Sequence, residues 1–209
     1  MDVADRGVSA PGFWEDLYAR GEDGWDLGEP APPLAAWLAA GGRFSGGQDR
    51  PARLAVPGCG RGHDARLLAA AGYAVTGFDF AEAAISAARA RAAADGLAIE
   101  FERRDVFTLG AGYPAFFDAV WEYTCFCAID PARRGEYVRA LRAALRPGGT
   151  LLACFYPLRA GTDGPPFPVS TEGVLRALSP DFTIEEAGPP AQSVERRRGL
   201  EWLVRATRH

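Results

Sequence analysis

The stretch Val56-Pro57-Gly58-Cys59-Gly60-Arg61-Gly62 decides how this chain folds. A short apolar run at residues 53–56 enters it and predicts a strand, and residues 63–71 leave it with the pattern of a helix. Glycine is needed where a backbone turns sharply or passes close to a ligand. A glycine-rich turn from a strand into a helix therefore predicts an α/β fold that holds a ligand near the turn.

The spacing of the glycines separates two kinds of cofactor loop. A dinucleotide loop has the pattern G-x-G-x-x-G, with a pyrophosphate at the start of the helix. Here Gly58 and Gly60 fit that pattern, but its third glycine position holds His63, so that the spacing is G-x-G-x-G. An NAD-dependent oxidoreductase is the weaker interpretation for this reason. A tight turn with a purely structural role is a further alternative.

Predicted strands and helices alternate along the rest of the chain. We expect strands at residues 53–56, 74–79, 98–103, 117–123, 150–156, 182–186 and 200–207. We expect helices at residues 12–20, 33–40, 63–71, 81–95, 131–145 and 171–178. Such alternation is typical of βαβ units around a parallel sheet, in which ligands bind at the carboxyl ends of the strands.

Two acidic residues stand at these strand ends. Asp79 closes the second predicted strand, where a carboxylate can accept both hydroxyls of a ribose. Asp105 follows the third predicted strand, where a carboxylate can meet the amino group of an adenine. An acid at one strand end is usually a solvated cap. Together with the glycine loop, three such features at consecutive strand ends favour a cofactor that contains a nucleoside.

Length and composition bound the remaining possibilities. A chain of 209 residues fits one domain, so we expect residues 1–209 to fold as a unit. A formal net charge of −4 argues against a nucleic-acid-binding face. No apolar run approaches the ~20 residues of a membrane span, and residues 1–6 lack the pattern of a signal peptide. We therefore expect a cytoplasmic protein with neither membrane nor nucleic acid as a partner.

Several kinds of catalytic site are excluded by missing residue types. The chain has no lysine, which excludes a P-loop lysine, a Schiff-base lysine and a pyridoxal-phosphate anchor. Its two histidines, His63 and His209, disfavour a histidine-based triad and a multi-histidine metal site. The four cysteines do not have zinc-site spacing, and we expect neither a metal nor a disulfide.

The glycine loop with its two following acids resembles the class I S-adenosylmethionine (SAM)-dependent methyltransferases. The resemblance implies a Rossmann-like α/β fold with a seven-stranded, mostly parallel sheet, an antiparallel last strand and helices on both faces. It also implies that the glycine loop packs on the methionine part of SAM, that the first acid holds the ribose, and that the second acid contacts the adenine between two apolar residues. The cofactor-binding residues are then Gly58, Gly60, Asp79, Asp105, Phe80 and Val106.

Further segments resemble the thiopurine S-methyltransferase family, and most closely its thiol and halide methyltransferase branch. The resemblance runs from about residue 12 to residue 207 and is most specific near the N-terminus and around Tyr123. Within the branch's aspartate-tyrosine-threonine stretch, Glu122 replaces the more usual aspartate. The matching segments are residues 13–18, 24–28, 33–34, 122–129, 155–157, 164–170 and 198–201.

This second resemblance implies a helical lid and an acceptor pocket. Residues 1–50 form an N-terminal lid over a core at residues 51–209, and Trp14, Tyr18, Trp25 and Tyr123 line the SAM pocket. The physics agrees, because a sulfonium cation is attracted to an aromatic face. Without the resemblance, Trp14 and Tyr18 could equally be core residues at helical spacing. Tyr156, at the end of the fifth predicted strand, lines the acceptor pocket and orients the nucleophile.

Two groups of side chains are further candidates for the acceptor pocket. Residues 196–198 form a run of arginines, which we interpret first as a solvated face and alternatively as an attraction for anionic substrates. His63 is not one of these candidates, and we interpret it as a polar residue at a helix terminus and not as a catalyst. Apolar walls of the pocket are expected from Phe13, Phe126, Pro166 and Phe167.

The expected reaction is an in-line transfer of a methyl group from SAM to a small soft nucleophile, leaving S-adenosylhomocysteine. Thiol, hydrosulfide, thiocyanate, halide and thiopurine acceptors all fit. Ionised acceptors need no proton transfer, which suits a chain poor in histidine and lysine. A small-molecule O- or N-methyltransferase and a non-catalytic SAM-binding module are the alternatives. We expect a monomer.

Overall fold

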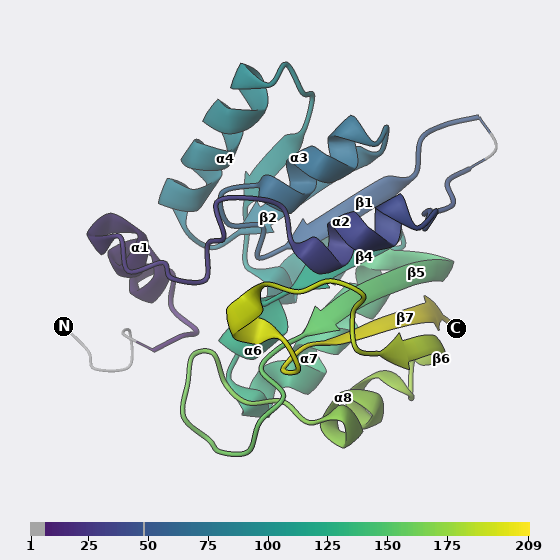
Figure 1. The fold of residues 1–209 in the computed structure, drawn as a ribbon. Helices are drawn as coiled ribbons and strands as arrows, with labels where there is room; N and C mark the ends of the chain where they lie inside the picture. Colours follow the sequence, from purple (N-terminus) through teal and green to yellow (C-terminus); the bar gives the residue numbers. More distant parts are fainter. Residues whose placement is uncertain (1–6, 48) are drawn as a thin grey trace.

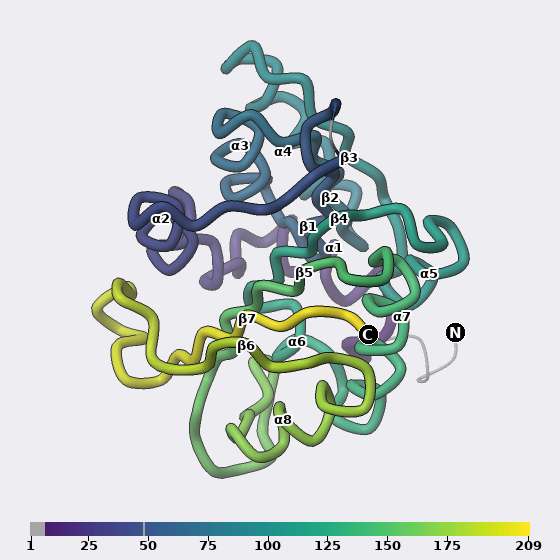
Figure 2. Tube along the Cα trace, turned by 90° about the vertical axis from the view of Figure 1, so that its right-hand side faces the viewer, coloured from purple at the N-terminus to yellow at the C-terminus, as the bar shows by residue number. Residues whose placement is uncertain are grey.

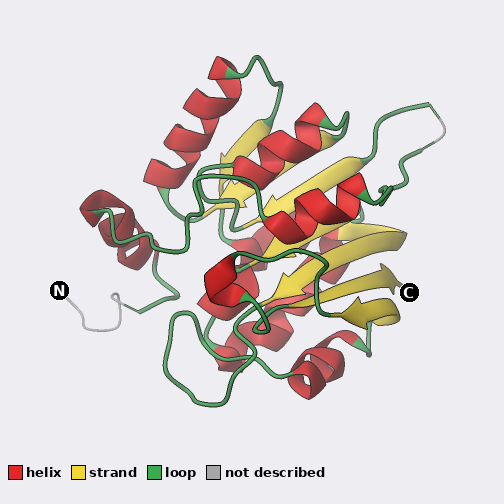
Figure 3. Cartoon of the chain, in the orientation of Figure 1, coloured by secondary structure: helices red, strands yellow, loops and turns green. Residues whose placement is uncertain are grey.

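The fold is taken from a computed structural model, which describes residues 7–47 and 49–209. The signal-peptide prediction falls on residues 1–6, outside the described residues. A seven-stranded sheet runs through the molecule with helices on both sides (Figures 1 and 3). Its strands are β1 (Arg53–Pro57), β2 (Ala74–Asp79), β3 (Glu100–Arg103), β4 (Phe117–Tyr123), β5 (Leu145–Phe155), β6 (Phe182–Gly188) and β7 (Trp202–Arg208).

The order of the strands is β3-β2-β1-β4-β5-β7-β6. Neighbouring strands from β3 to β5 are parallel, and β7 is antiparallel to both β5 and β6. The predicted sheet, with its antiparallel last strand, is confirmed. The direction of winding reverses between β1 and β4, which opens a crevice at the carboxyl ends of these two strands.

Helices cover both faces of the sheet, as the sequence predicts. In Figure 2, α2 and α3 lie on one side of the strands and α5 and α7 on the other. The helices are α1 (Pro11–Arg20), α2 (Pro32–Ala39), α3 (His63–Ala70), α4 (Glu82–Ala94), α5 (Leu109–Gly112), α6 (Cys125–Ala128), α7 (Arg134–Ala144) and α8 (Thr171–Leu178), with 3₁₀ turns η2 (Val106–Thr108), η3 (Pro131–Arg133) and η4 (Glu195–Arg197).

Alternating side chains of the central strands build two cores. On β1, Leu54 and Val56 face the core under α2, α3 and α4, whereas Ala55 faces the core under α7 and α8. Successive side chains of a strand point to opposite faces, so a strand buried on both sides is apolar at every position. All seven residues of β4 are buried, and five of them follow this rule, whereas Asp118 and Glu122 are buried acids.

Several boundaries differ from the predicted ones, most of them by one or two residues. The predicted strand at residues 98–103 begins at Glu100, and the predicted helix at residues 131–145 divides into η3 and α7. The fifth strand begins at Leu145 instead of residue 150, because Leu145 pairs with Phe117 before the register shifts and Thr150 pairs with Ala119. The Pro-Gly-Gly sequence at residues 147–149 thus forms an irregularity within the strand and does not precede it.

The glycine loop is the turn that connects β1 to α3. Gly62 is the N-cap residue of α3 and has a φ of +76°, in the left-handed region that residues with a Cβ atom avoid. A Cβ atom there would lie 2.9 Å from Cζ of Phe101 on β3 and 3.0 Å from Cβ of Ala88 on α4. Glycine at this position therefore allows the loop to sit directly on β3 and α4.

We expect Gly62→Ala to lower the free energy of unfolding by about 2 to 4 kcal/mol, because backbone strain adds to overpacking. Gly96→Ala is the matched control, since Gly96 has a φ of +67° and no atom within 4 Å of the added methyl group. The control should cost only the backbone part, about 1 to 2 kcal/mol. Urea titration of both variants measures the two values, and equal values would contradict the close packing of the loop.

Candidate active site

A cavity lies at the carboxyl ends of β1 and β4, where the winding of the sheet reverses. The glycine loop forms one side of it, and the segment that links α1 to α2 covers it. Five of the residues expected to bind the cofactor line this cavity: Tyr18, Trp25, Gly58, Gly60 and Tyr123. The other lining residues are Asp26, Leu27, Glu29, Ala31, Val56, Cys59, Arg61, His63, Asp64, Trp121 and Thr124.

The glycine loop leaves no room for side chains on the cavity side. Gly58 has a φ of +60°, and a Cβ atom there would lie 2.8 Å from Cβ of Cys125. Gly60 has a φ of +52°, and its Cβ would lie 3.3 Å from the hydroxyl oxygen of Tyr18. Bare backbone therefore lies against Cys125 of α6 at Gly58 and against the cavity-lining Tyr18 at Gly60.

Asp79 connects the end of β2 to this loop. Its carboxylate accepts hydrogen bonds from the backbone N–H of Gly60, at 2.9 Å, and of Ala81, at 3.0 Å. Burial raises the pKa of Asp79, although these N–H groups act in the opposite direction. A carboxylate offers about four acceptor positions, and the two backbone bonds use two of them. Acceptor capacity therefore remains for hydroxyl groups of a ligand.

Asp79, Phe80, Asp105 and Val106 lie outside the lining of the cavity. The backbone N–H of Arg104 donates to the carbonyl of Asp79, which places Asp105 next to the end of β2. One carboxylate oxygen of Asp105 caps η2 by accepting from the N–H of Phe107. Val106 is buried in the core under α7. The proposed adenine contacts of Asp105, Phe80 and Val106 remain predictions.

The aromatic residues of the lid form one packed group. The ring of Trp25 makes edge contacts with those of Trp14, at 5.6 Å between centroids, and of Tyr18, at 5.5 Å. The indole N–H of Trp14 donates to the carbonyl of Val8. Tyr18 and Trp25 line the cavity, whereas Trp14 packs behind Trp25.

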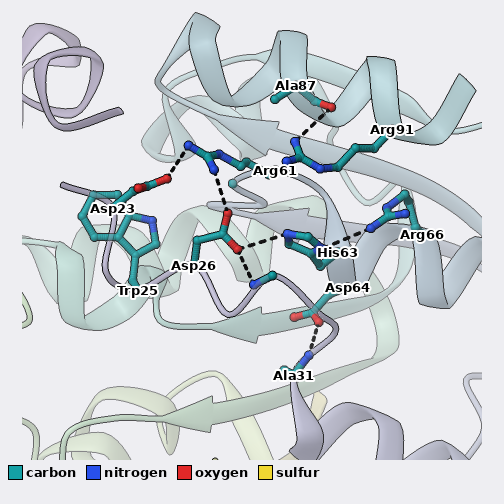
Figure 4. Close-up of polar contacts among 12 residues, drawn as sticks. Asp23, Trp25, Asp26, Ala31, Arg61, His63, Asp64, Arg66, Ala87 and Arg91 are labelled. Carbon is teal, nitrogen blue, oxygen red and sulfur yellow. Dashed lines mark hydrogen bonds and ion pairs between the residues drawn. The ribbon is translucent and has the colours of Figure 1, made fainter. Parts of the chain in front are cut away.

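Ion pairs hold the lid against the glycine loop, and the sequence did not predict them (Figure 4). Arg61 contacts the carboxylates of Asp23, at 2.5 Å, and Asp26, at 3.4 Å. Nε2 of His63 lies 3.1 Å from Asp26, and its Nδ1 accepts from Arg66. Burial lowers the pKa of His63, and Arg66 adds to this effect. With its Nδ1 bonded to Arg66 and its Nε2 beside Asp26, His63 fits its predicted role as a polar residue at a helix terminus.

Asp64 attaches the end of the lid to the sheet. Its carboxylate accepts from the backbone N–H of Ala31 and from the indole N–H of Trp121, each at 2.7 Å. Burial raises the pKa of Asp64, and the bonds from Ala31 and Trp121 oppose this. One carboxylate on α3 therefore joins the segment before α2 to the middle of β4.

The arginine run near the C-terminus divides into exposed and buried members. Arg197 is only 2% exposed, so its interpretation as part of a solvated face is wrong, while Arg196 and Arg198 are exposed. Arg197 donates to the hydroxyl of Tyr123, at 2.6 Å, and to the carbonyl of Trp25, at 3.1 Å. Its guanidinium carbon lies 4.8 Å from the ring centroid of Tyr156 and 5.2 Å from that of Tyr123. These described partners include no carboxylate.

Tyr123 connects this arginine to a second buried charge. Its hydroxyl donates to Oε1 of Glu201 at 2.5 Å while it accepts from Arg197. Glu201 is 2% exposed, and its Oε2 has no hydrogen-bond partner among the described residues. Burial raises the pKa of Tyr123, Arg197 lowers it and Glu201 raises it further. Only the match of residues 198–201 to a known family pointed to this segment in the sequence.

The remaining acceptor-pocket candidates lie in different surroundings. Phe126 is buried in the core against Phe155 and Tyr137 and does not line the cavity. Phe13 packs edge-on against Trp14. The backbone N–H of Phe167 donates to the carbonyl of Cys127, which holds the 157–168 segment near α6.

Glu122 is buried directly before the cavity-lining end of β4. One carboxylate oxygen accepts from the backbone N–H of Phe126 at 2.7 Å, and the other has no partner among the described residues. Burial raises the pKa of Glu122 from 4.5 to about 7, against the effect of the N–H groups of Phe126 and Cys125. Thr124, two residues later, has a φ of +66°, which is a strained conformation for a β-branched residue.

The raised pKa of Glu122 predicts a pH-dependent stability. The folded state holds the proton more tightly than the unfolded state, so this stabilisation is present below pH 4.5 and is lost as the pH rises through about 7. Glu122→Gln removes the titration. Between pH 5 and pH 8 the stability of the variant relative to the wild type should rise by about 2 to 3 kcal/mol. Urea titrations at both pH values measure it, and a constant difference would show that Glu122 ionises normally.

Two further findings concern membranes and metals. Over residues 7–47 and 49–209, none of the helices combines the length and the apolar character needed to cross a bilayer. Within the same part of the chain, no three or more His, Cys, Asp or Glu side chains gather in a way that could hold a metal ion. The four cysteines are free thiols.

Some known proteins are similar to this chain in sequence, and one solved structure is similar to it in fold. The family model described as thiopurine S-methyltransferase matches residues 9–209. A probable thiol methyltransferase 2 of Arabidopsis thaliana is 30% identical, covering 94% of this chain and 85% of its own length. Thiocyanate methyltransferase 1 of Brassica oleracea is 31% identical, covering 93% and 84%. A structure solved for the conversion of a disulfide bond into a thioacetal group during echinomycin biosynthesis has a TM-score of 0.75 and 28% identity, covering 95% and 92%.

Proposed function

This chain belongs to the thiopurine S-methyltransferase family, and we propose on that premise that it transfers a methyl group from SAM to a small, soft, anionic nucleophile. The observation that carries the acceptor class is the buried guanidinium of Arg197, which has no carboxylate among its described partners. Thiocyanate, halide, hydrosulfide and ionised thiols all belong to this class. SAM is the cofactor, and S-adenosylhomocysteine is its product.

The residues around the glycine loop fit SAM in three respects. Bare backbone in the loop allows close approach of the methionine part, and a Cβ atom at Gly60 would project toward the cavity-lining Tyr18. Asp79 keeps acceptor positions for the ribose hydroxyls. When bound, SAM supplies a methyl group on a sulfonium sulfur. The aromatic rings of Tyr18 and Trp25 suit that cation, at about 0.5 to 2 kcal/mol per contact.

Arg197 suits an anionic acceptor because burying a charge is costly unless the charge is paired. Its described hydrogen-bond partners are neutral oxygens of Tyr123 and Trp25, and its planar face lies on Tyr156. An anion held beside this guanidinium would pair with it directly, because its link to the buried carboxylate of Glu201 runs through the hydroxyl of Tyr123. Tyr156 would then contact the acceptor, in keeping with the role that the sequence predicts for it.

The chain's own residues orient the reactants and exclude water. Arg61, Asp64 and Arg197 each attach the lid to the core. An anion stripped of water reacts faster with a cationic methyl donor, because the charges disappear in the reaction. We propose that the segment up to residue 50 works as a lid on one catalytic domain, with Trp14 supporting Trp25 from behind.

The test of this function is a transfer assay with radiolabelled SAM and thiocyanate, iodide, hydrosulfide or thiophenol as acceptor. We expect volatile or extractable methylated products with at least thiocyanate and one thiol. Absence of product with every acceptor, at saturating SAM, would contradict the proposal. Methylation of phenols or amines alone would favour the O- or N-methyltransferase alternative.

The role of Arg197 can be tested separately. Arg197→Met keeps a long apolar side chain against Tyr156 but removes the charge. We expect the KM for thiocyanate and iodide to rise about 10- to 100-fold, the value of a charge-assisted hydrogen bond. Arg198→Met is the matched control, because that side chain is 70% exposed. An unchanged KM in the Arg197 variant would place the anion site elsewhere.

A further inference from the structure

Arg197, Tyr123 and Glu201 form a chain of hydrogen bonds between two buried charges. The guanidinium donates to the Tyr123 hydroxyl at 2.6 Å, and that hydroxyl donates to the Glu201 carboxylate at 2.5 Å. The three residues come from η4, from the end of β4 and from the residue before β7. An anion site alone needs the arginine and has no use for a buried carboxylate, so Glu201 requires another explanation.

We propose that Tyr123 and Glu201 form a proton relay that ionises acceptors arriving in protonated form. The relay rests on the proposed methyl transfer and adds neutral thiols and hydrogen sulfide to the acceptors. The S–H bond of the acceptor breaks, and its proton binds to the hydroxyl oxygen of Tyr123. The original hydroxyl proton of Tyr123 passes to Oε1 of Glu201. Sulfur keeps the electron pair and becomes the nucleophile.

The geometry at Tyr123 leaves one position open for an acceptor. A phenolic oxygen donates one hydrogen bond and has two lone pairs. The donor position is used by Glu201 and one lone pair by Arg197. The second lone pair is free to accept an S–H proton, and Tyr123 lines the cavity that contains the glycine loop.

The two neighbours of Tyr123 have distinct tasks. Burial raises the pKa of Tyr123, so that a free tyrosinate is too costly and the phenol cannot act as a base alone. Glu201 removes this difficulty by taking the phenolic proton as the new one arrives. Arg197 stabilises the negative charge that develops on the oxygen during the exchange. Oε2 of Glu201 has no partner among the described residues, so no hydrogen-bond donor there opposes protonation of the carboxylate. After the product leaves, the proton returns through Tyr123 to solvent.

The relay divides acceptors by whether they carry a proton. Thiocyanate and 4-nitrobenzenethiol are already ionised at neutral pH and do not need it, whereas 2-mercaptoethanol is protonated and does. The experiment measures kcat/KM with these three acceptors for the wild type, Glu201→Gln, Glu201→Asp and Glu185→Gln. Glutamine keeps an acceptor for the Tyr123 hydroxyl but is not a base, and aspartate keeps the base. Glu185 is an exposed residue of β6 and serves as the matched control.

For Glu201→Gln we expect kcat/KM to fall about 100-fold with 2-mercaptoethanol and about threefold or less with the two ionised acceptors. Glu201→Asp should recover part of the loss, and Glu185→Gln should match the wild type. The ratio between acceptors is taken on one protein sample, so partial unfolding of a variant cancels.

Two results would overturn the relay and leave methyl transfer intact. One is an equal loss, or no loss, with all three acceptors in Glu201→Gln. The other is a wild-type protein that methylates thiocyanate but not 2-mercaptoethanol. If the wild type methylates none of the three, the proposed function itself fails, and the relay fails with it.

Discussion

The backbone N–H of Gly60 donates to the carboxylate of Asp79 across the ends of β1 and β2. This bond sets the direction of the glycine loop, and the loop in turn determines where Arg61 and His63 meet the lid. Because the loop carries no side chain at Gly60, Tyr18 of the lid can approach its backbone. The cavity thus lies between this loop, the lid and the end of β4.

Buried charge accumulates around this cavity, at a cost to stability. Asp79, Glu122, Arg197 and Glu201 are each less than a tenth exposed. A buried ion lowers stability unless it is well paired, and such groups are concentrated where a protein binds or transforms a ligand. Asp79 is paired with backbone N–H groups, while Arg197 and Glu201 share one hydroxyl. Arg197 and Glu201 therefore have a greater capacity than Asp79 to interact with a ligand.

The sequence predicts the parts of this protein that follow from local rules. The glycine loop, the alternation of strands and helices, and Asp79 at a strand end can all be read from spacing and periodicity. The four-residue helices α5 and α6 are too short to show a helical period. Contacts such as Arg197 with Tyr123 join residues far apart in the chain. In a run of three arginines, nothing local distinguishes the one that the fold buries.

The central claim is that this crevice binds SAM, and isothermal titration calorimetry with S-adenosylhomocysteine tests it most directly. A parallel titration with NAD tests the competing use of the glycine loop. We predict saturable binding of S-adenosylhomocysteine at one site per chain, with no heat of binding from NAD. Binding of NAD alone, or of neither compound, would contradict this prediction. The glycine loop would then have a dinucleotide-binding or a purely structural role.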